Sequence, residues 1–183
     1  MILLIASIIG SVVLDQLTKQ LAVIYLQGEA SFPLWKNVLH FTYAENRGAA
    51  FGMLSDQRWI FMVVSSIAII GLLIFLICFR PKNRWVQISL AMIVGGGIGN
   101  MIDRILLGYV IDFIDFTLID FAIFNVADSF VTVGAFMLMG YLIWDMLCDY
   151  RAEREKKAAQ PSTATSSSTD DAATSNTETQ DES

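Results

Sequence analysis

The chain has 183 residues, of which 55% are hydrophobic and only 16% are charged, and its mean hydropathy is +0.55. Because an ordinary soluble domain carries about 25% charged residues, this composition excludes that class and indicates an integral membrane protein. The formal net charge of −6 points to no nucleic acid or other charged partner, because residues 158–183 hold five acidic residues and no Lys or Arg, which leaves a net charge of −1 for the rest of the chain.

Four apolar runs are long enough to cross a membrane, since a hydrocarbon core of about 30 Å needs about 20 helical residues. They lie at residues 1–26, 59–79, 86–107 and 128–147. The first run carries Asp15 and Lys19, four apart on one helical face, which predicts either a mutual ion pair or a functional role. It lacks a basic leading segment, so it is not expected to be a cleaved signal peptide.

The distribution of Lys and Arg predicts the orientation of these spans, because cytoplasmic loops are enriched in both residue types. The connection at 108–127 contains neither and is expected outside, as is the longer first loop at 27–58. Both termini are then cytoplasmic. The residues that mark the cytoplasmic side are Arg80, Lys82 and Arg84 in the short second loop and Arg151, Arg154, Lys156 and Lys157 after the fourth run.

The two outer loops contain segments that predict extended structure. Residues 38–43 are β-branched and aromatic, and residues 113–121 are too apolar for a free loop. Because an open sheet edge is not tolerated in lipid, these strands are expected at the headgroup level. The chain therefore divides into a membrane domain at 1–150 and a segment at 151–183. That segment is a basic stretch followed by an acidic, Ser/Thr-rich tail, which is expected to be disordered from residue 158.

Four carboxylates and an amide follow the third run, in a region without a nearby cation. Two carboxyl groups held close together share one proton, which gives hydrolysis an ionised base and a neutral acid. The spacing does not decide which two would pair, and acidic loop residues facing water remain the alternative. The residues are Asp112, Asp115, Asp120, Asn125 and Asp128.

The end of the third run predicts close packing and polar support. Four glycines within residues 95–99 allow another helix to approach closely. Asn100 and Arg104 lie one turn apart on one face and are expected to steady a carboxylate from another segment. Asp103 is expected to point elsewhere, as a charge at the membrane interface.

Metal and serine chemistry are not expected. Cys78 and Cys148 have no partner at metal-ligand spacing, His40 is the only histidine, and no HExxH sequence occurs. The region also offers no Ser-His arrangement. No metal ion and no cofactor is therefore predicted.

Taken together, four segments resemble the lipoprotein signal peptidase family, also called signal peptidase II. Each box alone is modest, but all four occur in order at the ends of the four spans, between residues 1 and 148. Gly97 is a small departure where alanine is expected in many members. The first box is DQLTK at 15–19, the second is NRGAAF at 46–51 and the fourth is FNVADS at 124–129. The third box comprises GG at 95–96, GN at 99–100, DR at 103–104, Gly108, Val110 and DF at 112–113.

The resemblance implies an all-α membrane protein, a four-helix bundle with a small extracytoplasmic β-cradle and a short surface helix. It places the chain in the bacterial cytoplasmic (inner) membrane as a multi-pass protein with its active site near the outer face. It further implies that Asp112 and Asp128 are the catalytic pair of an aspartyl endopeptidase. Residues that would support the pair or bind substrate are Asn46, Asn100, Arg104, Asn125, Asp15 and Lys19.

The same resemblance implies the substrate: a bacterial prolipoprotein whose cysteine already carries a diacylglyceryl group, cleaved just before that cysteine. The lipid would remain among membrane lipids, because moving it to water costs about 0.8 kcal/mol per CH₂. The antibiotic globomycin is expected to inhibit such an enzyme, which needs neither metal nor cofactor.

Two other functions compete with this one. A proton-coupled carrier would place membrane carboxylates on facing helices around a midplane cavity. An assembly factor would use the outer loops as docking surfaces only. The acidic residues gather at one end of the spans, which favours chemistry at the membrane surface.

Overall fold

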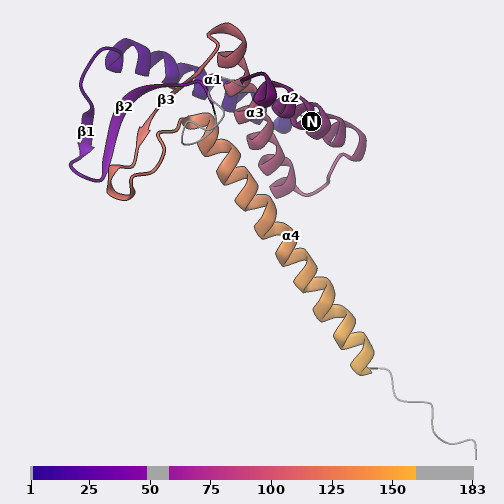
Figure 1. Ribbon diagram of the computed structural model, residues 1–183. Helices are drawn as coiled ribbons and strands as arrows, with labels where there is room; N and C mark the ends of the chain where they lie inside the picture. The colour runs from indigo at the N-terminus through magenta and orange to yellow at the C-terminus, as the bar shows by residue number, and fades with distance from the viewer. Residues whose placement is uncertain (1, 49–57, 160–183) are drawn as a thin grey trace, which may run out of the picture. The chain divides into compact units, whose positions relative to one another are not determined.

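The computed structural model describes residues 2–48 and 58–159 and contains four helices long and apolar enough to cross a membrane (Figure 1). This confirms the predicted spans. The fourth helix continues beyond its apolar run, because the following Glu, Lys and Arg residues favour helix and Lys157 pairs with Glu153 at 2.8 Å. The helices are α1 (Ile2–Leu26), α2 (Arg58–Phe79), α3 (Arg84–Leu106) and α4 (Val126–Ala159).

The chain divides into two compact units, Met1–Ile143 and Trp144–Ser183, and every candidate site residue belongs to the first. Helix α3 is the central helix of this unit and packs against both α1 and α2. A Cβ atom at Gly96 would collide with the carbonyl oxygen of Ala127, and one at Gly99 would collide with the carboxylate of Asp15. The predicted close packing at these glycines is confirmed, because α3 has no side chain where α4 and α1 approach it.

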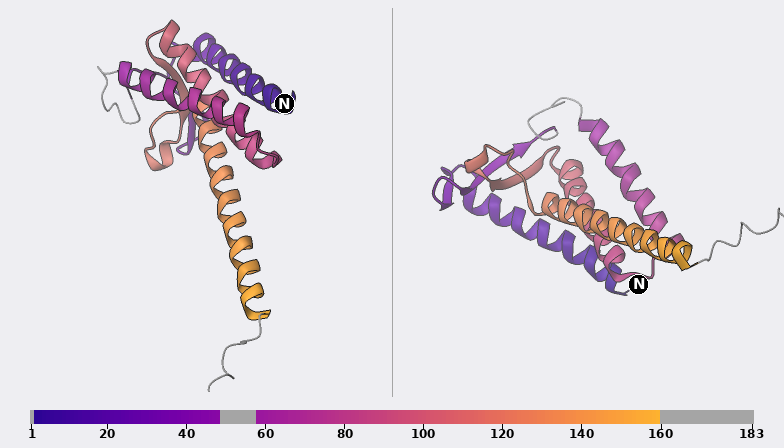
Figure 2. Two further views of the ribbon diagram at one scale, coloured as in Figure 1. Left: turned by 90° about the vertical axis from the view of Figure 1, so that its right-hand side faces the viewer. Right: turned by 90° about the horizontal axis from the view of Figure 1, so that it is seen from below.

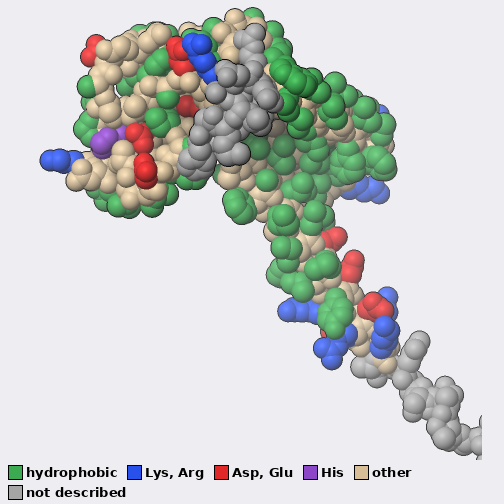
Figure 3. All heavy atoms as spheres, viewed as in Figure 1, with side chains coloured by type: hydrophobic (Ala, Val, Ile, Leu, Met, Phe, Trp, Pro, Cys, Tyr) green, Lys and Arg blue, Asp and Glu red, His purple; other side chains and the backbone are tan. Residues whose placement is uncertain are grey.

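The outward surfaces of the helices are apolar. On α2 the side chains of Ile67, Ile70 and Ile74 are more than half exposed, and hydrophobic side chains cover much of the helical face in Figure 3. In water this surface would oppose folding, whereas a bilayer offers it apolar surroundings. The exposed side chains therefore agree with four membrane-spanning helices.

A three-stranded antiparallel sheet in the order β1-β2-β3 completes the unit. It comprises β1 (Phe32–Trp35), β2 (Leu39–Asn46) and β3 (Val110–Asp115) and lies near the end of α1 away from the N-terminus (Figure 2). An apolar cluster of Ala22, Ile111 and Phe113 attaches the sheet to α1. The register places Ala44 opposite Asp112, so β2 and β3 together position one of the predicted catalytic carboxylates.

The sheet differs from the sequence-based prediction in three ways. The strand expected at 38–43 extends to Asn46, and the one expected at 113–121 begins at Val110 and ends at Asp115. After it comes a 3-10 turn, η2 (Thr117–Ile119), and the left-handed backbone of Asp120, with φ 50°, turns the chain. Strand β1 was not predicted, because Pro33 weakens its sequence signal and is tolerated only at a sheet edge.

Two predictions fall outside the described residues. The tail was predicted to be disordered from residue 158; residues 158–159 instead end α4, and 160–183 lie outside the described part, as do residues 49–51 of the second family-like box. For 160–183 and 49–51 the predictions stay predictions.

Candidate active site

Asn125 joins the two aspartates that the family resemblance singles out. Its side-chain nitrogen donates to Asp112 Oδ1 at 2.6 Å. Its backbone N–H donates to Asp128 Oδ2 at 3.3 Å, while its side-chain oxygen accepts from the backbone N–H of Asp128 at 2.9 Å. This reciprocal pair is a capping box that starts α4. One buried residue therefore fixes the carboxyl groups of Asp112 and Asp128 relative to each other.

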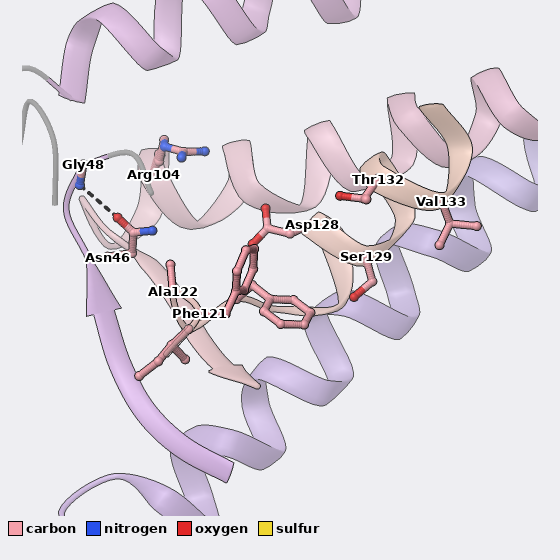
Figure 4. Close-up of a pocket in the computed structure, with 11 residues that line it drawn as sticks. Asn46, Gly48, Arg104, Phe121, Ala122, Asp128, Ser129, Thr132 and Val133 are labelled. Atoms are coloured by element: carbon pink, nitrogen blue, oxygen red, sulfur yellow. Dashed lines mark hydrogen bonds between the residues drawn. The ribbon is translucent and has the colours of Figure 1, made fainter. Parts of the chain in front are cut away.

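Two further amides complete the contacts of these carboxyl groups. Asn46, at the end of β2, donates to Asp112 Oδ2 at 2.9 Å, and its oxygen accepts from the backbone of Gly48 at 3.0 Å (Figure 4). Asn100 of α3 donates to Asp128 Oδ1 at 2.7 Å, and its oxygen accepts from Lys19 Nζ at 2.8 Å. Because each amide oxygen already has a donor, each amide nitrogen is directed at a carboxylate.

Asp112 is almost completely buried, with 1% of its surface exposed. Burial above all, and then the nearby charge of Asp128, raise the pKa of Asp112 to about 7. Hydrogen bonds from Asn46 and Asn125 and the charge of Lys19 oppose this rise without cancelling it. Asp112 can therefore hold or release a proton near neutral pH, as a group in acid–base catalysis must.

Arg104 places a positive charge near this pair. Its guanidinium donates to the backbone oxygen of Asn100 at 3.3 Å, one turn earlier on α3, as their spacing predicted. Its charge also acts on Asp128, Asp112 and Asp103. Arg104 thus supplies positive potential to a site that holds several acidic groups.

A buried ion cluster supports the site from the side of α1. Lys19 Nζ lies 2.9 Å from Asp15 and 2.8 Å from Asp103. The predicted pairing of Asp15 with Lys19 is confirmed. The prediction for Asp103 is wrong: it is 3% exposed and ion-paired, not an interface charge. Its position three residues after Asn100, on a shared helical face, was a signal that could have placed it near the site but could not name Lys19 as its partner.

A pocket of about 460 Å³ opens beside Asp128, within the volume range of small-ligand sites. In Figure 4 Asp128 lies between Asn46 and Gly48 on one side and Thr132 and Val133 on the other. Asp112 is not part of the pocket wall, so Asp128 is the carboxylate that faces it. The lining residues are Asn46, Gly48, Arg104, Phe121, Ala122, Ile123, Phe124, Asp128, Ser129, Thr132 and Val133.

The structure thus brings together all eight residues proposed from the sequence, and it leaves two aspartates apart. Asp115 accepts a hydrogen bond from the Thr42 hydroxyl at 3.0 Å, and Asp120 is exposed. Within the described residues, neither joins the amide network. Sequence reasoning missed Ser129, Thr132 and Val133 as pocket residues. Thr132 could have been found, because it follows Asp128 by four positions and so shares its side of the helix.

The fold and site define a helical membrane protein in which a buried carboxyl group and a half-buried one lie where the spans meet a small sheet. A family model described as signal peptidase (SPase) II matches residues 7–144. A lipoprotein signal peptidase of Caldanaerobacter subterraneus subsp. tengcongensis is 51% identical over 72% of this chain and 89% of its own length. That of Brevibacillus brevis is 43% identical over 82% of this chain and 97% of its own.

Two solved structures described as bacterial membrane enzymes share the fold. One has a TM-score of 0.71 and 34% identity, covering 78% of this chain and 88% of the other. The second has a TM-score of 0.69 and 35% identity, covering 76% of this chain and 91% of the other. The chain therefore belongs to the lipoprotein signal peptidase (signal peptidase II) family, whose members are peptidases.

Proposed function

We propose that Asp112 and Asp128 are the catalytic pair of an aspartyl endopeptidase. The observation that carries this proposal is the bridge through Asn125, which contacts both residues and holds one buried carboxyl group beside a second that faces a pocket. Two carboxyl groups in this relation favour a state in which they share one proton. Peptide hydrolysis needs that state, since it uses a base and an acid together.

In the proposed reaction, the ionised carboxylate removes a proton from water, and the neutral one donates a hydrogen bond to the scissile carbonyl. The water oxygen then bonds to the carbonyl carbon, and proton return to the amide nitrogen breaks the C–N bond and releases the amine. The pKa of Asp112, about 7, supports Asp112 as the carboxyl group that holds the proton. Asp128 faces the pocket and would activate the water.

The neighbouring residues then have distinct roles. Asn46, Asn100 and Asn125 hold the two carboxyl groups through their amide nitrogens. Arg104 offsets the negative charge that accumulates during water attack. Asp15 and Lys19 form a buried ion pair, and Lys19 orients Asn100 by donating a hydrogen bond to its side-chain oxygen.

The proposed substrate is a prolipoprotein carrying a diacylglyceryl cysteine, cleaved just before that cysteine. The apolar outer surfaces of the helices would leave the lipid in the bilayer, while the peptide reaches the pocket beside Asp128. Globomycin is proposed to compete for this site. The carrier hypothesis is less well supported, because Asp112 lies on a strand and Asp128 in the first turn of α4, not around a midplane cavity.

We place this site near the outer face of the bacterial inner membrane, with both termini cytoplasmic. The arginines and lysine of 80–84 and the basic stretch after residue 150 support this orientation. Residues 1–150 would form the peptidase domain, and 151–183 a cytoplasmic extension.

Purified protein incubated with matched lipidated and unlipidated precursor peptides tests the proposal. Cleavage of the lipidated peptide alone, at the bond before the modified cysteine, is expected. Equal cleavage of both peptides would contradict the substrate, and no cleavage of either would contradict the peptidase assignment.

A further inference from the structure

The buried ion cluster also contacts the backbone on both sides of the site. Asp103 Oδ2 accepts from the backbone N–H of Ile111 at 3.2 Å, and Ile111 directly precedes Asp112. Asp15 Oδ1 accepts from the backbone N–H of Ala127 at 2.9 Å, and Ala127 directly precedes Asp128. Each acidic residue of the cluster therefore holds the chain one residue before a proposed catalytic aspartate.

These backbone contacts are not explained by local secondary structure. The first N–H groups of a helix have no partner within that helix, and for Ala127 the partner comes from a different helix, α1. The N–H of Ile111 is likewise satisfied by a side chain of α3. Both backbone segments are therefore fixed to the α1–α3 pair.

Lys19 links the two contacts. It is 1% exposed and lies within 2.9 Å of both carboxylates, one on its own helix and one on α3. It also donates to Asn100, which contacts Asp128. Removing the Lys19 ammonium would leave two buried carboxylates without compensation, so this one cation holds both acidic side chains in place.

We propose that Asp15 and Asp103 are positioning residues, which hold the backbone before Asp128 and Asp112, and that Lys19 between them fixes the separation of the two aspartates. This inference rests on the proposed catalytic role of that pair. A displacement of about 1 Å at a reacting group can lower the rate about 10²-fold. The cluster lies outside the pocket wall, so its loss is expected to reduce kcat more than substrate binding.

Two substitutions of Asp103 separate the backbone contact from the charge. Asp103→Asn keeps an oxygen that can accept from Ile111 and leaves Lys19 paired with Asp15. Asp103→Leu has similar volume but no acceptor. We expect Asp103→Leu to lower kcat about 10²-fold with little change in KM, and Asp103→Asn to retain most of kcat.

Hydrogen exchange gives a readout that does not depend on activity. The Ile111 amide is expected to exchange faster in Asp103→Leu than in Asp103→Asn, with the Ala127 amide less affected. Asp15→Leu and Asp15→Asn form the reciprocal pair, for which faster exchange is expected at the Ala127 amide of the Leu variant. This second pair tests the positioning role if Asp103→Leu does not fold. Asp149→Leu and Asp149→Asn, at an exposed position of α4, are the matched controls and should retain wild-type kcat.

Equal kcat for the Leu and Asn variants, a loss confined to KM, or unchanged exchange at Ile111 would overturn the positioning role. The proposed function fails separately, if Asp112→Asn retains turnover. An inactive Asp112→Asn beside a fully active Asp103→Leu would reject only the positioning role.

Discussion

The side-chain nitrogen of Asn125 donates a 2.6 Å hydrogen bond to Asp112, a carboxyl group that is 1% exposed. The same residue caps α4 through Asp128. The start of a membrane helix and the buried carboxyl group on a strand are thereby held by one side chain. This relationship connects the folding of the helix terminus to the geometry of the proposed catalytic pair.

The pH dependence of turnover should follow Asp112. Because its pKa is raised to about 7, its protonated form predominates below that pH and is lost above it. Turnover that requires this proton is expected to fall as the pH rises through about 7. Rates measured from pH 5 to 9 on a lipidated precursor test this, and a flat profile across neutrality would contradict it.

Asn46→Ala should move that alkaline fall to higher pH. The hydrogen bond from Asn46 favours the ionised form of Asp112 and lowers its pKa, so its removal raises the pKa further. The measurement is the same pH series on the purified variant. A fall displaced to lower pH would show that Asn46 acts on another group.

Arg104→Ala should lower turnover by roughly 10- to 100-fold. The guanidinium offsets the charges of Asp128 and Asp112 and lines the pocket, so its loss removes positive charge that compensates these acids. Arg104→Lys keeps the charge and should recover part of the activity. Steady-state rates decide this, and wild-type activity in Arg104→Ala would exclude Arg104 from the site.

Gly96→Ala should destabilise the protein, because the added Cβ would collide with the backbone oxygen of Ala127. Overpacking of this kind costs about 1–3 kcal/mol, and a backbone atom cannot rotate away. Gly71→Ala is the matched control, since a Cβ there meets nothing within 4 Å. Thermal unfolding in detergent should show a lower midpoint for Gly96→Ala only; equal midpoints would contradict the α3–α4 contact.

The orientation can be tested with an impermeant thiol reagent on intact cells, after Cys78 and Cys148 are replaced by alanine. Lys36→Cys, in the exposed turn after β1, should be labelled. Lys82→Cys, in the basic loop between α2 and α3, should be labelled only after lysis. The reverse pattern would invert the orientation predicted from the Lys and Arg distribution.

The sequence predicted the spans well, because length and hydropathy alone decide which segments can cross a bilayer. The Asp15–Lys19 pair followed from helical periodicity. The role of Asp103 could not be predicted from helical periodicity, because its partner Lys19 is on another helix and only the tertiary packing brings the two residues together. The contact of Asn46 with Asp112 likewise depends on the register of β2 and β3, and a sheet register between distant segments leaves little local signal.

Turnover of a lipidated precursor by purified Asp112→Asn and Asp128→Asn tests the proposed catalytic pair most directly. The amide preserves shape but cannot accept a proton from water or share one across the pair, and loss of acid–base assistance costs about 10²–10⁴-fold. Both variants should be inactive while folded, with globomycin binding as the folding check, and Asp120→Asn, at an exposed position, should be nearly unaffected. If either variant keeps more than about a tenth of wild-type turnover, the pair is misassigned.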